Sequence, residues 1–183
     1  MKNILRTVVL ALLTSCLGLF ADQTTPNSLV APYADSLVVL KGDKLVPLKA
    51  DRFLRAPFIV VYFGAGWCPD CRRFSPSLVA AYDQQTANAR RFEVLLVSRD
   101  QTEEAMLKFM KTEKMTWPAL DFGKITGAQQ LQELYSGHGI PCLTVLDQQG
   151  KVVLQSKSDQ DGTEILRELE TLLKRAGSDS ERQ

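Results

Sequence analysis

The chain has 183 residues, a length that suits one domain with a sizeable core and extensions at its ends. Apolar residues make up 45% and charged residues 23%, which is the ordinary balance of a globular protein. The formal net charge is +1 and the basic residues are scattered among acidic ones, so we expect no nucleic-acid partner.

Residues 1–21 have the pattern of an export signal. They have a basic start and a mostly apolar run, residues 8–20, which is short for a membrane span of roughly 20 apolar residues. The Leu-Thr-Ser-Cys stretch that ends at Cys16 resembles a bacterial lipobox, in which the cysteine becomes the lipidated first residue. Lipidation at Cys16, cleavage after Ala21, an uncleaved anchor and a buried helix of the fold stay open. We expect an exported, periplasmic protein that is tethered to the membrane through its N-terminus.

Beyond this signal, the sequence predicts a tether, a folded domain and a tail. Residues 22–35 are polar with two prolines, residues 36–176 hold the expected helices and strands, and residues 177–183 form a polar tail expected to be disordered. In chain order we expect a hairpin, a short helix, a strand, a helix, a strand, a helix, a short extended segment, a helix, a second hairpin and a last helix. These are residues 36–40, 44–48, 50–55, 58–63, 69–82, 92–97, 102–110, 117–120, 126–135, 143–146, 152–154 and 164–173.

Two of these segments, residues 58–63 and 92–97, are apolar runs typical of strands that are buried on both faces. Strands then alternate with amphipathic helices, and the chain closes on an antiparallel hairpin. This order predicts an α/β fold with a central mixed β-sheet, helices on both faces and an added N-terminal β-hairpin.

The clearest chemical feature is the Trp-Cys-Pro-Asp-Cys segment at residues 67–71, where a buried strand turns into a helix. A helix start has unpaired N–H groups and the positive end of the helix dipole, which favour a thiolate, so we expect Cys68 to be the attacking thiol. Cys71 lies one turn further on and can attack a mixed disulfide formed at Cys68. Pro69 suits the first helical turn because its missing N–H is not needed there. We expect Pro69 and Asp70 to set the acidity of the dithiol.

A metal site is the first alternative to a redox dithiol. A tetrahedral zinc site needs four ligands, and His138 and Cys142 have a spacing that would complete a set with Cys68 and Cys71. The buried strand, glycine break and tryptophan ahead of the cysteines favour redox chemistry, so we expect no metal. A second alternative is a binding or holdase module that keeps the fold without turnover.

The segment at residues 62–74, Tyr-Phe-Gly-Ala-Gly-Trp-Cys-Pro-Asp-Cys-Arg-Arg-Phe, resembles the active-site segment of tryparedoxins and nucleoredoxins, within the thioredoxin-like superfamily. Residues 92–100, 115–120 and 139–145 resemble later segments of that family in the expected order. The resemblance covers residues 36–155. It implies the thioredoxin-like fold and a thiol–disulfide oxidoreductase without a cofactor.

The resemblance also implies roles for residues beside the dithiol. Pro141 is expected to be the cis-proline that faces the two cysteines, and the backbone of Ile140 is expected to pair with a substrate chain. Trp67 is expected to touch substrate or to pack at the rim of the site. The implied partners are protein dithiols or disulfides and a further redox partner, and we expect a monomer.

Four positions call for separate interpretations. Tyr62 stands where thioredoxins carry a buried carboxylate, and a tyrosine at this position is similar to tryparedoxins. Cys142 follows the expected cis-proline, where the family often has threonine, and we interpret it as a small buried hydrophobe rather than a third redox thiol. We interpret His138 as a loop residue. Trp117 fits either the core or an apolar docking surface shared with Trp67.

Asp70 occupies a position where tryparedoxins usually have proline, and it bears on redox direction. Its charge, close to Cys68, opposes thiolate formation, whereas Arg72 and Arg73 are expected to be mobile and screened. Less stabilisation of the reduced thiolate means a more reducing couple. The sequence therefore predicts a reductase or isomerase rather than an oxidase.

Overall fold

The structure is a computed structural model that describes residues 26–88, 91–157 and 162–180. Its strands are β1 (Leu37–Lys41), β2 (Lys44–Pro47), β3 (Phe58–Gly64), β4 (Phe92–Ser98), β5 (Ala119–Leu120), β6 (Cys142–Asp147) and β7 (Val152–Gln155). Its α-helices are α1 (Pro69–Asn88), α2 (Glu103–Thr112), α3 (Gln129–Gln132) and α4 (Gly162–Ser180). Three short 3₁₀ helices are η1 (Ala31–Ser36), η2 (Phe53–Arg55) and η3 (Phe122–Lys124).

The seven strands form one mixed sheet in the order β2-β1-β5-β4-β3-β6-β7. Strand β3 lies near its middle, parallel to β4 and antiparallel to β6. The hairpin of β1 and β2 joins the sheet through β5. The α/β fold expected from the pattern, including the added N-terminal hairpin, is therefore confirmed.

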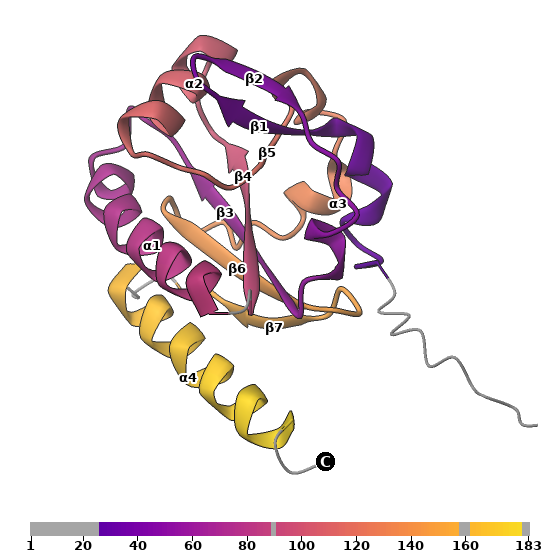
Figure 1. The fold of residues 1–183 in the computed structure, drawn as a ribbon. Coiled ribbons are helices and arrows are strands. Elements are labelled where there is room, and N and C mark those ends of the chain that lie inside the picture. The colour runs from indigo at the N-terminus through magenta and orange to yellow at the C-terminus, as the bar shows by residue number, and fades with distance from the viewer. Residues whose placement is uncertain (1–25, 89–90, 158–161, 181–183) are drawn as a thin grey trace, which may run out of the picture.

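Helices cover both faces of this sheet. On one face α1 and α4 lie side by side and α2 packs nearby, so that Phe74, Met106 and Leu169 share one apolar cluster with the strands (Figure 1). On the other face η2 and α3 contribute Leu54 and Leu131 to a second cluster. Strand β3 supplies buried side chains to both clusters, because successive residues of a strand point to opposite faces.

The predicted helix at 126–135 is the main difference within the fold, because only residues 129–132 are α-helical. The flanking backbone instead forms hydrogen bonds of the 3₁₀ type, which span three residues. Examples are those from Ala128 N–H to Ile125 O and from Leu134 N–H to Leu131 O. The carbonyl of Leu134 then accepts hydrogen bonds from Thr144 Oγ1 and Gln155 Nε2. These side chains come from β6 and β7, so strand contacts end the helix that the apolar spacing predicts.

The segment predicted as a tether, residues 22–35, packs onto the domain from Asn27 onward. Asn27 and Val30 are fully buried. The Asn27 side chain accepts from the N–H groups of Leu29 and Val30, and it donates to the carbonyl of Asp147 at 2.7 Å. Asparagine is a common turn residue, so the sequence suggests a turn at Asn27. It does not show that the side chain binds a carbonyl 120 residues away. The folded part thus begins earlier than predicted.

At the C-terminus, α4 continues to Ser180, into the segment 177–183 that the sequence marks as a tail. At the N-terminus, the expected signal and Cys16 lie outside the described residues. Within the ranges that the structure describes, no helix combines the length and the apolar character needed to cross a membrane.

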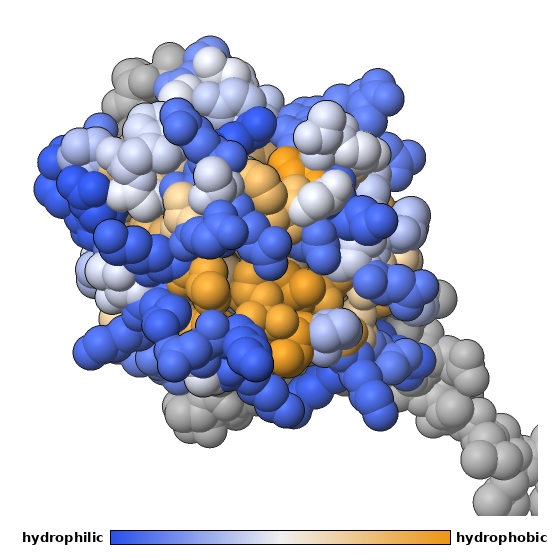
Figure 2. Space-filling model, turned by 90° about the horizontal axis from the view of Figure 1, so that it is seen from above, coloured by the Kyte–Doolittle hydropathy of each residue, from blue (hydrophilic) through white to orange (hydrophobic). Residues whose placement is uncertain are grey.

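The face of the domain that Figure 2 shows is hydrophilic around its edge, and hydrophobic side chains gather in its middle. The large hydrophobic side chains exposed in the described part of the chain are Trp67, Val152 and Val153. Val152 and Val153 belong to β7, an edge strand. Trp67 has 58% of its surface exposed and directly precedes Cys68.

Candidate active site

The two cysteines lie where β3 passes into α1. Cys68 N–H donates to Ala65 O, and Cys68 O accepts from Arg72 N–H, the first bond of the helix. The Cys68 sulfur accepts a hydrogen bond from Cys71 N–H at 3.2 Å, so a backbone donor of the first helical turn points at it. Both thiols are free. Cys68 is 5% exposed and Cys71 is fully buried, so Cys68 is the one that a substrate can reach.

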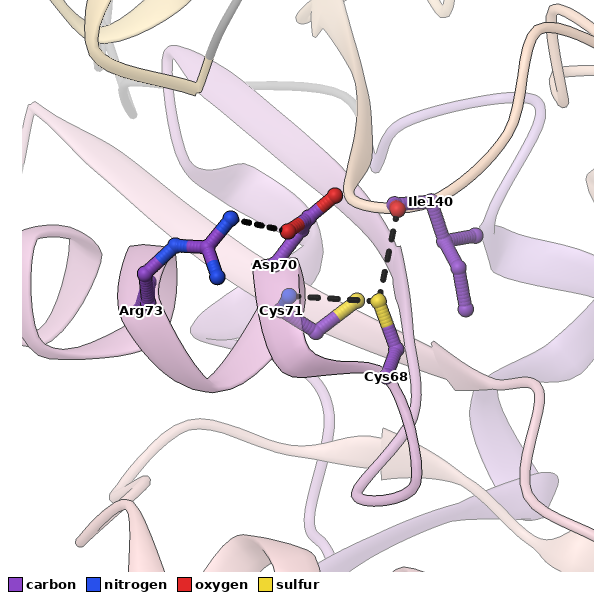
Figure 3. A network of polar contacts seen from close by, with 5 residues as sticks. All are labelled: Cys68, Asp70, Cys71, Arg73 and Ile140. Atoms are coloured by element: carbon purple, nitrogen blue, oxygen red, sulfur yellow. Dashed lines mark hydrogen bonds and ion pairs between the residues drawn. The ribbon is translucent and has the colours of Figure 1, made fainter.

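A loop that is distant in the sequence, just before β6, lies against this dithiol. The peptide bond between Ile140 and Pro141 is cis, as the resemblance implies. The thiol of Cys68 donates to the carbonyl of Ile140 at 3.4 Å, and Figure 3 shows that carbonyl facing the sulfur (Figure 3). The structure thus brings Cys68, Cys71, Ile140 and Pro141 together.

The two tryptophans have different environments. Trp67 stays at the surface, where its Nε1–H donates to Arg99 O at 3.0 Å. Trp117 is fully buried and packs edge-on against Tyr82, with ring centroids 5.4 Å apart. Trp67 can therefore touch a partner protein. The alternative in which Trp117 shares a docking surface with it is wrong, because Trp117 belongs to the core.

The charges around the dithiol differ from what the sequence suggested. Asp70 forms an ion pair with Arg73, which lies one helical turn further on, and Figure 3 shows the carboxylate directed at that guanidinium. Arg72 is also engaged, because its Nη1 donates to Gly66 O at 2.7 Å. The ion pair of Asp70 with Arg73 was not expected from the sequence; it forms because i,i+3 side chains on a helix meet, and both side chains stay largely exposed.

Burial dominates the electrostatics of Cys71. Desolvation raises the pKa of its thiol well above the ordinary value, and the neighbouring Cys68 raises it further. Hydrogen bonds from the Ala65 backbone and from the Tyr62 hydroxyl act in the opposite direction. Cys71 therefore stays protonated in the resting reduced protein and must lose a proton before it attacks.

The third described cysteine belongs to another part of the fold. Cys142 opens β6, is 1% exposed and packs in the cluster opposite the one that holds Cys68 and Cys71. Its sulfur lies 3.4 Å from Ser136 Oγ. This environment is that of a small buried side chain.

The structure does not bring the four candidate metal ligands, Cys68, Cys71, His138 and Cys142, together as one group. Across residues 26–88, 91–157 and 162–180, no three His, Cys, Asp or Glu side chains are grouped so that they could hold a metal ion. His138 instead lines a groove of about 380 Å³ together with Asp70, Ile140 and Pro141. A second groove of about 420 Å³ lies on the α2 side of Trp67 and includes Phe109. Grooves thus lie on both sides of the exposed start of α1.

Two residues of the site were not singled out from the sequence. Ser75 Oγ donates to Cys71 O at 2.8 Å and lies 3.0 Å from the hydroxyl of Tyr62. Ser75 lies four residues after Cys71, and thus on the same side of a helix; this spacing is the sequence feature that could have identified it. Gly64 ends β3, and a Cβ atom there would lie 2.5 Å from Tyr62 Cζ.

A helix-start Cys-x-x-Cys pair, a facing cis-proline loop and a central mixed sheet define a thioredoxin-like protein of the oxidoreductase class. Residues 58–152 match the model of a family described as thioredoxin-like, and the chain belongs to that family.

Two nucleoredoxins and a tryparedoxin illustrate the similarity. Nucleoredoxin of Xenopus laevis is 32% identical over 117 residues, which are 64% of this chain and 27% of that protein. Probable nucleoredoxin 2 of Oryza sativa subsp. japonica is 40% identical over 100 residues, 55% of this chain and 25% of that protein. Tryparedoxin from Trypanosoma brucei matches with a TM-score of 0.58 and 26% identity, over 76% of this chain and 91% of the solved chain. The chain thus spans about a quarter of the nucleoredoxins and most of the tryparedoxin.

Proposed function

We propose that this protein is a thiol–disulfide oxidoreductase that exchanges disulfides with exported proteins through Cys68 and Cys71. The observation that carries the proposal is the contrast between the two thiols at the start of α1. Cys68 faces the Ile140 loop and keeps 5% of its surface exposed, whereas Cys71 is fully buried and directs its N–H at the Cys68 sulfur. This is the arrangement that an attacking and a resolving thiol require.

The reaction proceeds in two displacements. The Cys68 thiolate attacks one sulfur of a substrate disulfide, the substrate S–S bond breaks, and the first substrate sulfur leaves as a thiolate that takes up a proton. Cys71 then loses its proton and attacks Cys68, which forms the Cys68–Cys71 disulfide and releases the second substrate thiolate. The substrate gains two electrons and the protein loses two, so a redox partner must reduce the protein again.

Substrate binding is assigned to Trp67 and to the Ile140–Pro141 loop. Trp67 offers an exposed aromatic face beside Cys68, and the half-buried Ile140 offers its backbone for pairing with an extended chain. The experiment that tests the function is reduction of insulin by the purified protein with a dithiol donor. Turnover supports an oxidoreductase, whereas binding of unfolded protein without turnover supports the holdase alternative.

We propose that the physiological direction is reduction or isomerisation. In the described part of the chain, the Cys68 sulfur accepts a hydrogen bond from a backbone N–H and from no cationic side chain. The two nearby guanidinium groups, those of Arg72 and Arg73, are bonded to Gly66 O and Asp70. Strong oxidants owe their potential to a stabilised reduced form, and no cationic side chain among the described residues bonds the Cys68 sulfur to provide it.

Equilibration of the Cys68/Cys71 couple against glutathione tests the direction. We expect a reduction potential below roughly −180 mV, the value of protein disulfide isomerase. Because Arg73 already compensates Asp70, Asp70→Asn should shift the potential by less than about 30 mV, which is a tenfold change in the equilibrium constant. A wild-type potential near the roughly −120 mV of a strong oxidant would contradict the proposed direction.

We further propose that the protein is exported and anchored through a lipidated Cys16. The basic start, the apolar run and the lipobox-like stretch of residues 1–21 support this proposal. Several acyl chains on one residue would hold the domain firmly at a membrane, whereas one chain binds only marginally. Mass spectrometry of the mature protein should find an acylated Cys16 as its first residue. An unmodified chain beginning at Asp22 would contradict this.

A further inference from the structure

The hydroxyl of Tyr62 is built into the dithiol site. Tyr62 lies on β3, fully buried, on the same face of the sheet as Cys71. Its hydroxyl is 3.0 Å from Ser75 Oγ, and Ser75 Oγ donates to the carbonyl of Cys71 at 2.8 Å. The Tyr62 hydroxyl also acts on the Cys71 thiol, whose pKa it lowers against the effect of burial. A polar group of the core is thus connected through Ser75 to the backbone of the buried cysteine, and it favours ionisation of that cysteine's thiol.

Gly64 makes this placement possible. A Cβ atom at Gly64 would lie 2.5 Å from Cζ and 2.6 Å from the hydroxyl oxygen of Tyr62. Real side chains do not approach that closely, so the ring can lie along the strand toward the start of α1 only because residue 64 has no side chain. Phe74 of α1 packs edge-on against this ring, with the two ring centroids 5.8 Å apart.

The surroundings determine what the hydroxyl can do. Burial raises the pKa of Tyr62 far above its ordinary value, so the hydroxyl keeps its proton and acts as a donor rather than a base. The titratable side chains that act on Cys71 are Tyr62 from β3 and Cys68 from the start of α1. Of these, Cys68 opposes ionisation of Cys71 and Tyr62 favours it.

We propose that Tyr62 donates a hydrogen bond to the Cys71 thiolate during the resolving displacement, and that Ser75 and Gly64 are positioning residues for that donor. With Cys71 protonated, Ser75 donates to Cys71 O and Tyr62 donates to Ser75. When Cys71 loses its proton to water, the two hydroxyl protons turn, so that Ser75 donates to Tyr62 and Tyr62 donates to the thiolate. The thiolate then forms its bond to Cys68 and the bond from Cys68 to the substrate sulfur breaks. This inference rests on the proposed dithiol mechanism.

The test separates the two displacements with the aromatic disulfide 5,5′-dithiobis(2-nitrobenzoate). Attack by Cys68 releases one coloured thiolate, and resolution by Cys71 releases the second, so stopped-flow absorbance records both phases. In Tyr62→Phe we expect the first phase to stay within about twofold of wild type and the second to slow about tenfold at pH 7, as for a lost hydrogen bond to a charged group. Because a hydrogen bond that lowers the pKa of Cys71 is lost, the pH profile of the second phase should move upward by about one pH unit.

Matched variants distinguish this role from a structural one. Tyr82→Phe removes another buried tyrosine hydroxyl, one that donates to Glu93, and should leave the second phase and its pH profile unchanged. Ser75→Ala should slow the second phase about threefold, Ser75→Thr should restore it, and this pair carries the test if Tyr62→Phe does not fold.

A second phase of wild-type rate and pH profile in Tyr62→Phe would overturn the inference, as would equal slowing in Tyr82→Phe. Wild-type protein that shows only the first phase would instead overturn the dithiol mechanism itself.

Discussion

Replacing Cys68 by serine is expected to lower insulin reduction by at least about 10³-fold, because the reaction loses its nucleophile. Serine is not ionised near neutral pH, and the thiolate is the attacking species. Cys71 cannot take over, since it is fully buried and its pKa is raised by that burial. Turnover with dithiothreitol, followed by precipitation of the insulin B chain, measures the effect.

Cys142→Ser is the matched control for this substitution. Cys142 is also buried, but it packs on the opposite face of the sheet from the dithiol. We expect this variant to keep its reductase rate within about twofold, as for a change that leaves both displacements intact. A loss of activity comparable to that of Cys68→Ser would contradict the interpretation of Cys142 as a small buried side chain.

Trp117→Ala is expected to lower the free energy of unfolding by about 3–5 kcal/mol, far more than the truncation of the exposed Trp67. Trp117 is the largest of the fully buried side chains, and its ring packs against Tyr82 of α1. The truncation leaves a cavity where α1 meets the sheet. A whole domain is stable by only about 5–15 kcal/mol, so the change should be visible in urea unfolding at equilibrium.

Trp67→Ala provides the contrast within the same chain. Trp67 is 58% exposed and makes one hydrogen bond, to Arg99 O, so its loss should cost less than about 1.5 kcal/mol. Its effect should appear as a raised KM for insulin, because the exposed ring lies beside Cys68. Equal destabilisation by the two substitutions would contradict the assignment of one tryptophan to the core and the other to the surface.

The sequence predicts those parts of the fold that depend on local patterns. The apolar runs of β3 and β4 mark strands that are buried on both faces, and the glycine break before Cys68 marks the strand-to-helix turn. The short α3 could not be predicted, because its end depends on side chains from β6 and β7 that bind Leu134 O. The docking of Asn27 likewise depends on a distant carbonyl, that of Asp147.

The same distinction holds for the candidate site. Cys68 and Cys71 are recognisable because their spacing and the helix start are local features. The arginine partner of Asp70 is also local, at i,i+3, but sequence spacing alone does not show whether two exposed side chains pair. Tyr62 reaches Ser75 across the strand–helix interface, over the space left by Gly64. A contact of that kind is visible only once the strand and the helix are placed together.

Trapping with Cys71→Ser tests the central claim most directly. Without the resolving thiol, a mixed disulfide between the protein and its substrate cannot be released, so adducts should accumulate and disappear on reduction. Mass spectrometry of the digested adducts should find the substrate attached to Cys68, the more exposed of the two thiols at the start of α1. Adducts attached through Cys142, or none at all with a substrate that the wild-type protein reduces, would contradict the assignment of Cys68 as the attacking thiol.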